Sequence, residues 1–225
     1  MNQIIVDNRH KINTACQICF FALDKYHKAV NAFNEEKRRI AATPYIQQEQ
    51  ERMVNQASDA LKNSAQGYYE EIKRNLDTIR AAAGEMENMM DIGEDLQNAL
   101  SVIKALGGSL PGETRIKLVE QFKGQRQALS LLKAAYESAG ITSQPYFQNL
   151  ILNTAKELDA LDDKAYRMVV APGENMMIAV NFGRDLEKFA ESLGVDLTKK
   201  FGEIVDTSDA LNAQLRAAMG LGAST

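Results

Sequence analysis

Residues 12–40 decide the fold, and they read INTACQICFFALDKYHKAVNAFNEEKRRI. Small or apolar side chains recur there at alternating steps of four and three, interrupted once by a charge, at Ile12, Cys16, Cys19, Leu23, Tyr26, Val30, Phe33, Lys37 and Ile40. Such a heptad seam lines one side of a long α-helix and packs against another helix. The stretch therefore predicts a long helix that needs a partner.

A second seam follows at once. Its apolar positions are Leu61, Ala65, Tyr68, Ile72, Leu76, Ile79, Ala83, Met86 and Met90. The link at 41–44 is short, and short links make neighbouring helices antiparallel. Charge agrees, because residues 1–43 hold seven basic and four acidic side chains whereas residues 44–110 hold six and eleven. We predict a long, coiled-coil-like antiparallel hairpin over residues 9–91.

The remainder of the chain also has helical spacing. Each of the four prolines in the whole chain, Pro44, Pro111, Pro145 and Pro172, falls where a helix is expected to begin. Further helices are expected over about 94–106, 112–138, 145–163, 172–194 and 197–218. Residues 166–182 leave a short β-hairpin as an alternative. The fold class is therefore predicted to be all-α, with a helical hairpin at 1–93 and a smaller helical bundle at 94–225.

Composition restricts the function. The 225 residues are 45% hydrophobic and 25% charged, with 26 basic and 30 acidic side chains and a net charge of −4. A protein that coats nucleic acid has a strong basic excess, so we expect no nucleic-acid partner. No apolar run approaches the roughly 18 residues that span a bilayer, so we expect no membrane partner. Two cysteines cannot build a disulfide scaffold, which favours a reducing, cytoplasmic location.

Two patterns could carry metal chemistry. Cys16-Gln17-Ile18-Cys19 is a CxxC motif, but a zinc site normally needs a second such pair, and both cysteines lie on the seam. The acidic run at 85–95 lacks the spacing of an EF-hand and the Glu-x-x-His pairs of a di-iron bundle. No P-loop, dinucleotide fingerprint or nucleophile elbow is present. We therefore expect no metal, no cofactor and no enzymatic activity.

The two heptad seams favour a function based on helix–helix association. We expect a homo-oligomer that forms through a self-association seam of Ile12, Leu23, Val30, Phe33, Leu61, Tyr68, Ile72, Leu76 and Ile79. Flexible thioether side chains suit adaptable binding surfaces as well as cores. Met86, Met89 and Met90 are therefore candidate partner-binding residues.

Three segments of the C-terminal half are similar to proteins of tailed bacteriophages. They read IKALGGSL at 103–110, IKLVEQFKG at 116–124 and ALSLLKAAY at 128–136, and they resemble helical head-assembly and scaffold-like structural proteins. The resemblance implies self-association, binding to coat or other virion proteins, and a place in the host cytoplasm or the virion. It also implies a basic helical C-terminus that contacts coat protein, for which Lys199, Lys200 and Arg216 are the candidates.

We therefore expect a structural or assembly protein, such as a scaffold-like or virion protein, that acts through self-association and protein binding. One alternative is a small helical adaptor or inhibitor that binds a single host protein. A second is a carboxylate-bridged metal enzyme.

Overall fold

The structure, a computed structural model, describes residues 3–88, 93–148, 150, 153–172 and 176–206. All regular structure within these ranges is helical, and no strand occurs in them. The predicted all-α class is confirmed.

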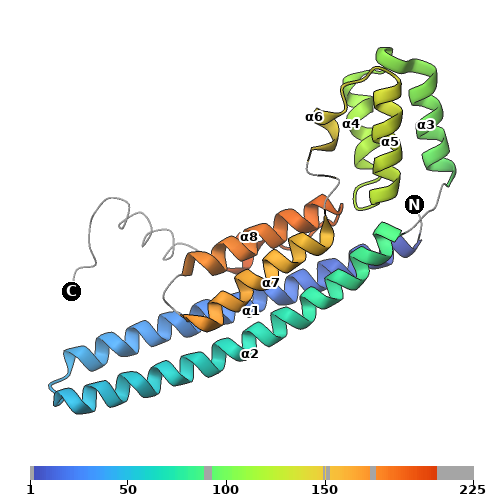
Figure 1. Ribbon diagram of the computed structural model, residues 1–225. Helices are drawn as coiled ribbons and strands as arrows, with labels where there is room; N and C mark the ends of the chain where they lie inside the picture. Colours follow the sequence, from blue (N-terminus) through green and yellow to red (C-terminus); the bar gives the residue numbers. More distant parts are fainter. Residues whose placement is uncertain (1–2, 89–92, 149, 151–152, 173–175, 207–225) are drawn as a thin grey trace, which may run out of the picture. The chain divides into compact units, whose positions relative to one another are not determined.

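The first two helices form the predicted antiparallel hairpin, which Figure 1 shows as two long rods side by side. Helix α1 spans Gln3–Ala42 and α2 spans Gln47–Asn88, so α1 begins earlier than expected. Pro44 lies in the connecting loop at 43–46 and does not open α2. The loop is fixed by side chains, because the Gln50 amide donates to the carbonyl of Thr43 at 3.2 Å.

The helices after the hairpin are shorter, and they are α3 (Glu94–Leu106), η1 (Gly107–Ser109), α4 (Gly112–Glu120), α5 (Arg126–Ser138), α6 (Gln144–Phe147), α7 (Thr154–Val170), α8 (Met176–Ser192) and α9 (Phe201–Ile204). The single helix expected over 112–138 is wrong, because the chain turns between α4 and α5 and Gly124 has a φ of 81°. The helix expected over 145–163 is also wrong, since α6 ends at Phe147 and α7 begins at Thr154.

The β-hairpin alternative for residues 166–182 is wrong in the described part of that segment. Residues 166–170 belong to α7, and residues 176–182 belong to α8. The segment is helical because the buried side chains of α8 form one stripe at helical spacing, whereas a hairpin would divide them between two faces. The stripe comprises Ala179, Val180, Phe182, Leu186 and Phe189. The last expected helix, over 197–218, is represented by α9, and its part beyond residue 206 lies outside the described residues.

The chain divides into two compact units, each built from separate stretches of sequence. Unit 1 comprises Met1–Thr14, Thr78–Leu158 and Lys188–Leu197, and unit 2 comprises Ala15–Asp77, Asp159–Glu187 and Thr198–Thr225. The boundary between the units therefore falls inside α1, α2, α7 and α8. The division into domains at 1–93 and 94–225 stays a prediction.

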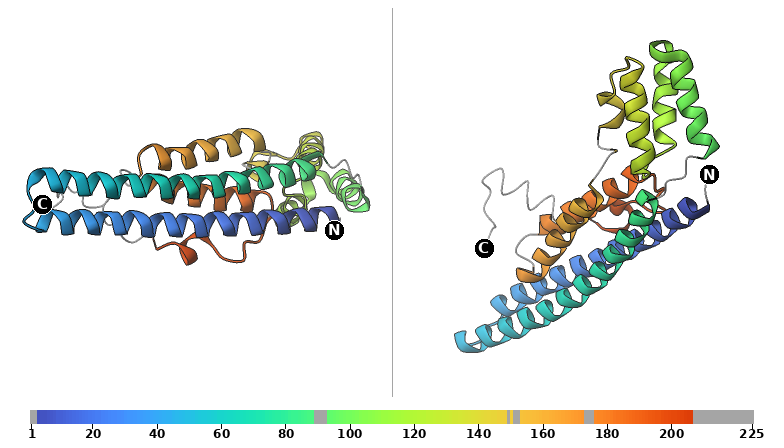
Figure 2. Two further views of the ribbon diagram at one scale, coloured as in Figure 1. Left: turned by 90° about the horizontal axis from the view of Figure 1, so that it is seen from below. Right: turned by 45° about the vertical axis from the view of Figure 1, so that its right-hand side comes forward.

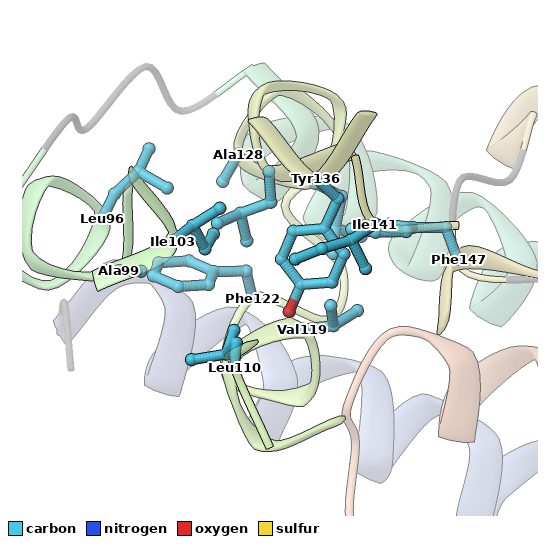
Figure 3. Close-up of a cluster of buried hydrophobic side chains, with 12 residues drawn as sticks. Leu96, Ala99, Ile103, Leu110, Val119, Phe122, Ala128, Tyr136, Ile141 and Phe147 are labelled. Carbon is cyan, nitrogen blue, oxygen red and sulfur yellow. The ribbon is translucent and has the colours of Figure 1, made fainter. Parts of the chain in front are cut away.

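Unit 1 contains a core in which small helices surround aromatic rings (Figure 3). The ring of Tyr136, on α5, meets the rings of Tyr146 and Phe147 edge-on, with centroids 5.8 and 5.3 Å away. The Tyr136 hydroxyl donates to the carbonyl of Arg115 at 2.8 Å. One buried aromatic residue therefore ties α4, α5 and α6 together.

Unit 2 is a helical bundle in which α7 and α8 lie against the hairpin (Figures 1 and 2). On α1, the Tyr26 hydroxyl donates to the carbonyl of Met168 on α7 at 3.3 Å. On α2, Tyr69 meets the ring of Tyr166 edge-on at 5.6 Å and donates from its hydroxyl to Asp162 at 3.2 Å. Helix α7 thus contacts both helices of the hairpin.

Candidate protein-binding surface

Most of the predicted self-association seam lies in the core of a single chain. Seven of its positions are buried, namely Ile12, Leu23, Val30, Leu61, Ile72, Leu76 and Ile79. The other two, Phe33 and Tyr68, are half-buried. The role of the seam in self-association stays a prediction, but a substitution at a buried position would act first on folding.

The CxxC cysteines belong to this core. Cys16 and Cys19 are both fully buried, and the Cys19 thiol lies 3.9 Å from the carbonyl oxygen of Ile72. Burial raises the pKa of Cys16 to about 12 and the pKa of Cys19 well above its usual value. Both thiols are therefore protonated at neutral pH, which makes them weak nucleophiles and weak metal ligands.

Two carboxylates of the acidic run have separate hydrogen-bond partners. Glu85 accepts a hydrogen bond from the amide of Asn8 at 2.9 Å, and Glu87 accepts one from the hydroxyl of Thr154. The acids at 94–95 occupy the first turn of α3, where they meet the positive end of the helix dipole. Within the described ranges, no group of His, Cys, Asp and Glu side chains is placed to hold a metal ion.

The methionine candidates do not form a visible surface. Met86 is fully buried, and its methyl carbon would lie 2.6 Å from a Cβ built on Gly124. Met86 is therefore a core residue of unit 1. Met89 and Met90 lie outside the described residues.

Of the basic candidates, Lys199 and Lys200 are exposed in unit 2, whereas Arg216 lies outside the described residues. The Lys200 ammonium is 3.7 Å from the carboxylate of Glu187 on α8. The carbonyl of Lys199 accepts a hydrogen bond from the amide of Gln17 at 2.8 Å. Both lysines thus belong to the segment that holds α9 in place.

The loop end of the hairpin is the part of unit 2 that α7 and α8 leave uncovered (Figures 1 and 2). We call residues 31–60 the distal hairpin. No residue between 41 and 60 is buried, although α2 itself continues from residue 47. Phe33, Met53 and Ala57 are each half-buried, whereas Leu61, next along α2, is 5% exposed.

Ion pairs and ring contacts distinguish two sides of the hairpin. Lys25 and Glu71 each precede a buried seam residue by one position, and their charged groups are 3.9 Å apart across α1 and α2. Tyr69 follows a seam residue by one position and contacts Tyr166 of α7. The positions that precede seam residues in the two helices therefore share one side of the hairpin, and Tyr69, on the other side, faces α7.

The side of the hairpin that carries Lys25 and Glu71 continues into the distal hairpin as one stripe of side chains on each helix. We call these two stripes the outer face. On α1 they are Ala29, Ala32, Glu36 and Arg39, and on α2 they are Glu49, Met53, Ala57 and Ala60. All eight side chains are exposed or half-buried. The outer face is apolar and mostly small at its centre, with charges near the loop.

Two arginine–glutamate pairs carry these charges. Arg39 binds both oxygens of Glu36, at 2.7 and 2.5 Å, and Arg52 binds both oxygens of Glu49, at 2.8 and 2.5 Å. Hydrogen bonding to the arginine lowers the pKa of each glutamate, so both carboxylates are ionised at neutral pH. The α1 stripe thus ends in one positive and one negative group, whereas the α2 stripe ends in Glu49, whose partner Arg52 lies beside the stripe.

The seam was predictable from sequence, and the outer face was missed. Alanine, glutamate and arginine look like an ordinary solvated helix face when each helix is considered alone. A recognisable signal was the opposite charge of Lys25 and Glu71, one position before the seam in each helix.

Comparison with known protein families, curated proteins and solved structures gives no match. Among the described residues, no helix combines the length and the apolar character that crossing a bilayer requires.

Proposed function

We propose that this chain is a structural or assembly protein that acts by helix–helix association with other copies of itself and with other proteins. The supporting observation is the absence of buried side chains at 41–60, where the apolar Met53, Val54 and Ala57 remain half-buried. Two helices cover only part of each other's apolar surface. A further pair of helices packed on the distal hairpin would cover more of Phe33, Met53 and Ala57.

The gain from such packing is sufficient to matter. Complete burial of a large apolar side chain stabilises a structure by roughly 1.5–3 kcal/mol. Phe33 and Met53 are half-buried already, so each would contribute about half of that range per copy. Because a dimer buries every such residue twice, a few side chains are enough to favour reversible association.

Light-scattering mass over a concentration series tests this function. We expect a weight-average mass that rises above the 24.9 kDa of one chain as concentration increases. Met53→Lys should reduce the association, because it places a charge at the centre of the outer face. Gln56→Lys is the matched control, since residue 56 is exposed on the same helix and lies outside the outer face. A monomer at every concentration would contradict self-association, and a monomer that binds one host protein would favour the adaptor.

The narrower form of the proposal is a scaffold-like or virion protein of a tailed bacteriophage, found in the host cytoplasm or the particle. Its support is the resemblance carried by segments within residues 103–136, which run from the last turn of α3 through α4 into α5. Mass spectrometry of purified precursor shells and mature particles tests it. A scaffold-like protein is expected in the shells, and a virion component in both.

A further inference from the structure

We propose that two copies associate in parallel through the outer face, with both loops at the same end and α1 of each copy packed against α2 of the other. The inference rests on the proposed function, and it names the partner as a second copy and the surface as the outer face. The symmetry axis then runs along the hairpin, so a residue keeps the same height in both copies.

The centre of the outer face suits close helix packing. Ala29 and Ala32 on α1 stand opposite Ala57 and Ala60 on α2 when the two helices are followed back from the loop. Small side chains let helices approach at the short end of the usual 8–10 Å interaxial range. Met53 is the one long apolar side chain of the face, and its flexible thioether can fill the gaps that alanines leave.

The charges near the loop are ordered so that a second copy complements them. Arg39 and Glu49 lie four and three positions from the loop at 43–46, and Glu36 and Arg52 lie seven and six positions from it. In the parallel pair, Arg39 of one copy is therefore level with Glu49 of the other. Glu36 is likewise level with Arg52. The twofold axis repeats both matches, which gives two Arg39–Glu49 pairs within the outer face and two Glu36–Arg52 pairs at its edge.

An antiparallel arrangement in which the two outer faces overlap completely lacks this match. When the same stretches of α1 overlap in opposite directions, Arg39 of one copy lies level with Val30 of the other, and Glu36 lies level with Phe33. In α2, Glu49 and Arg52 would then stand opposite Ala60 and Ala57. Charges would meet apolar side chains, and placing a charge against an apolar surface without a partner is unfavourable.

The size of the outer face predicts a weak, reversible dimer. From residue 47 to 60, α2 is about 21 Å long, and two adjacent helices are about 20 Å wide. The footprint of about 400 Å² per copy is half of the roughly 800 Å² per partner in a standard interface. We therefore expect dissociation in the micromolar range or above, and weaker association at high salt because exposed charges are screened.

Charge-pair reversal tests the arrangement without changing the net charge. Glu36→Arg with Arg39→Glu reverses the order on α1, and Glu49→Arg with Arg52→Glu reverses it on α2. Each double variant retains an arginine–glutamate pair within its own helix but brings like charges together between copies. We expect each to weaken dimerisation at least about tenfold. The quadruple variant should return to within about threefold of the unmodified chain, because both orders are reversed together.

The control is Asp59→Lys with Lys62→Asp, which reverses an exposed pair of the same spacing on α2 but off the outer face. Its dimerisation should be unchanged. Reversal near a helix end also alters the interaction with the helix dipole. That effect adds in the quadruple variant, so it cannot explain recovery of dimerisation there.

Disulfide formation between copies tests whether the two hairpins pack in parallel. The native cysteines are buried, so new surface cysteines react alone. Ala32→Cys and Ala57→Cys variants lie level across the parallel interface, and mixing them should yield a mixed disulfide faster than either variant alone. Mixing Ala32→Cys with Asp59→Cys should not. If the chain self-associates but the quadruple variant stays as weak as the double variants, the parallel outer-face dimer is wrong and the proposed function stands. A chain that is monomeric throughout overturns both.

Discussion

Phe201 packs directly on Gly183, so closely that a Cβ built on the glycine would lie 2.4 Å from Cε2 of the phenylalanine ring. The same ring stands 5.6 Å from that of Phe20 on α1, and Phe201 is 2% exposed. Its backbone N–H donates to Glu187 on α8 at 3.0 Å. Helix α9 has only four residues, so these contacts rather than its own helical hydrogen bonds hold it in unit 2.

Gly183→Ala should lower the free energy of unfolding by about 1–3 kcal/mol, because the new methyl group must displace a buried ring. This loss should exceed the gain of up to about 1 kcal/mol that alanine brings to a helix. Urea unfolding followed by circular dichroism measures it. Gly67→Ala on α2 is the control, since nothing lies within 4 Å of its Cβ, and it should be stabilising. Equal effects of the two changes would contradict the packing.

Gly124 and Gly140 separate crowding from backbone strain. Both have a positive φ, 81° and 70°, but a Cβ at Gly124 would lie 2.7 Å from the carbonyl oxygen of Leu193, whereas nothing is within 4 Å at Gly140. Gly140→Ala should cost about 1–2 kcal/mol for the left-handed backbone alone. Gly124→Ala should cost at least about 1 kcal/mol more, measured by the same unfolding assay. A smaller loss at Gly124 would contradict the close approach.

Alkaline pH should destabilise the fold through its buried thiols. An unfolded cysteine loses its proton near its ordinary pKa of 9.0, whereas Cys16 keeps its proton until about pH 12. Above pH 9 the unfolded state therefore binds fewer protons than the folded state, and stability falls as pH rises. The slope should reach up to about 1.4 kcal/mol per pH unit for each thiol.

Urea unfolding at pH 8, 9 and 10 measures this slope. The double variant Cys16→Ala, Cys19→Ala should flatten it, whatever its stability at pH 8. The range stops at pH 10 because Tyr136, whose pKa is raised to about 12 by burial, contributes in the same direction at higher pH. An unchanged slope would contradict the assignment to the thiols.

Tyr136 allows the hydrogen bond and the ring to be tested separately. Tyr136→Phe removes the donor to the carbonyl of Arg115 and should cost about 0.5–1.5 kcal/mol. Tyr136→Ala also removes the ring that packs between Tyr146 and Phe147, and it should cost about 3–5 kcal/mol. Thermal unfolding of both variants measures the difference. If the two losses were equal, the ring would not be the main contribution.

The hairpin was predictable because its signal is local and repeated. From Ile12 to Ile40, each apolar position confirms the period set by the one before it, and the loop at 43–46 leaves only an antiparallel return. The α8 stripe was recognisable for the same reason. Such patterns can be recognised in a sequence because a helix that buries a continuous stripe must keep the same apolar spacing over many residues.

The turn at Gly124 was not predictable in this way. Apolar spacing continues from Ile116 through Leu129, and the break depends on a close approach to Leu193, which is distant in sequence. The outer face was not predicted from the sequence for a related reason. Within one helix, the residues that come just before the seam positions look like ordinary surface residues. Only the ion pair between Lys25 and Glu71 shows that these residues of α1 and α2 lie on the same side of the hairpin.

The hydrogen bond from Gln17 to the carbonyl of Lys199 joins positions 182 residues apart. Contacts of such long range form slowly, because a large loop must close before they contribute. The cluster around Tyr136 uses only residues 96–147, which are close together in sequence. It can therefore assemble before the contact between Gln17 and Lys199 forms. During synthesis, the ribosome must therefore release nearly all of the described chain before Phe201 can dock. Until then, Gly183 and Phe20 lack the apolar cover that the Phe201 ring provides.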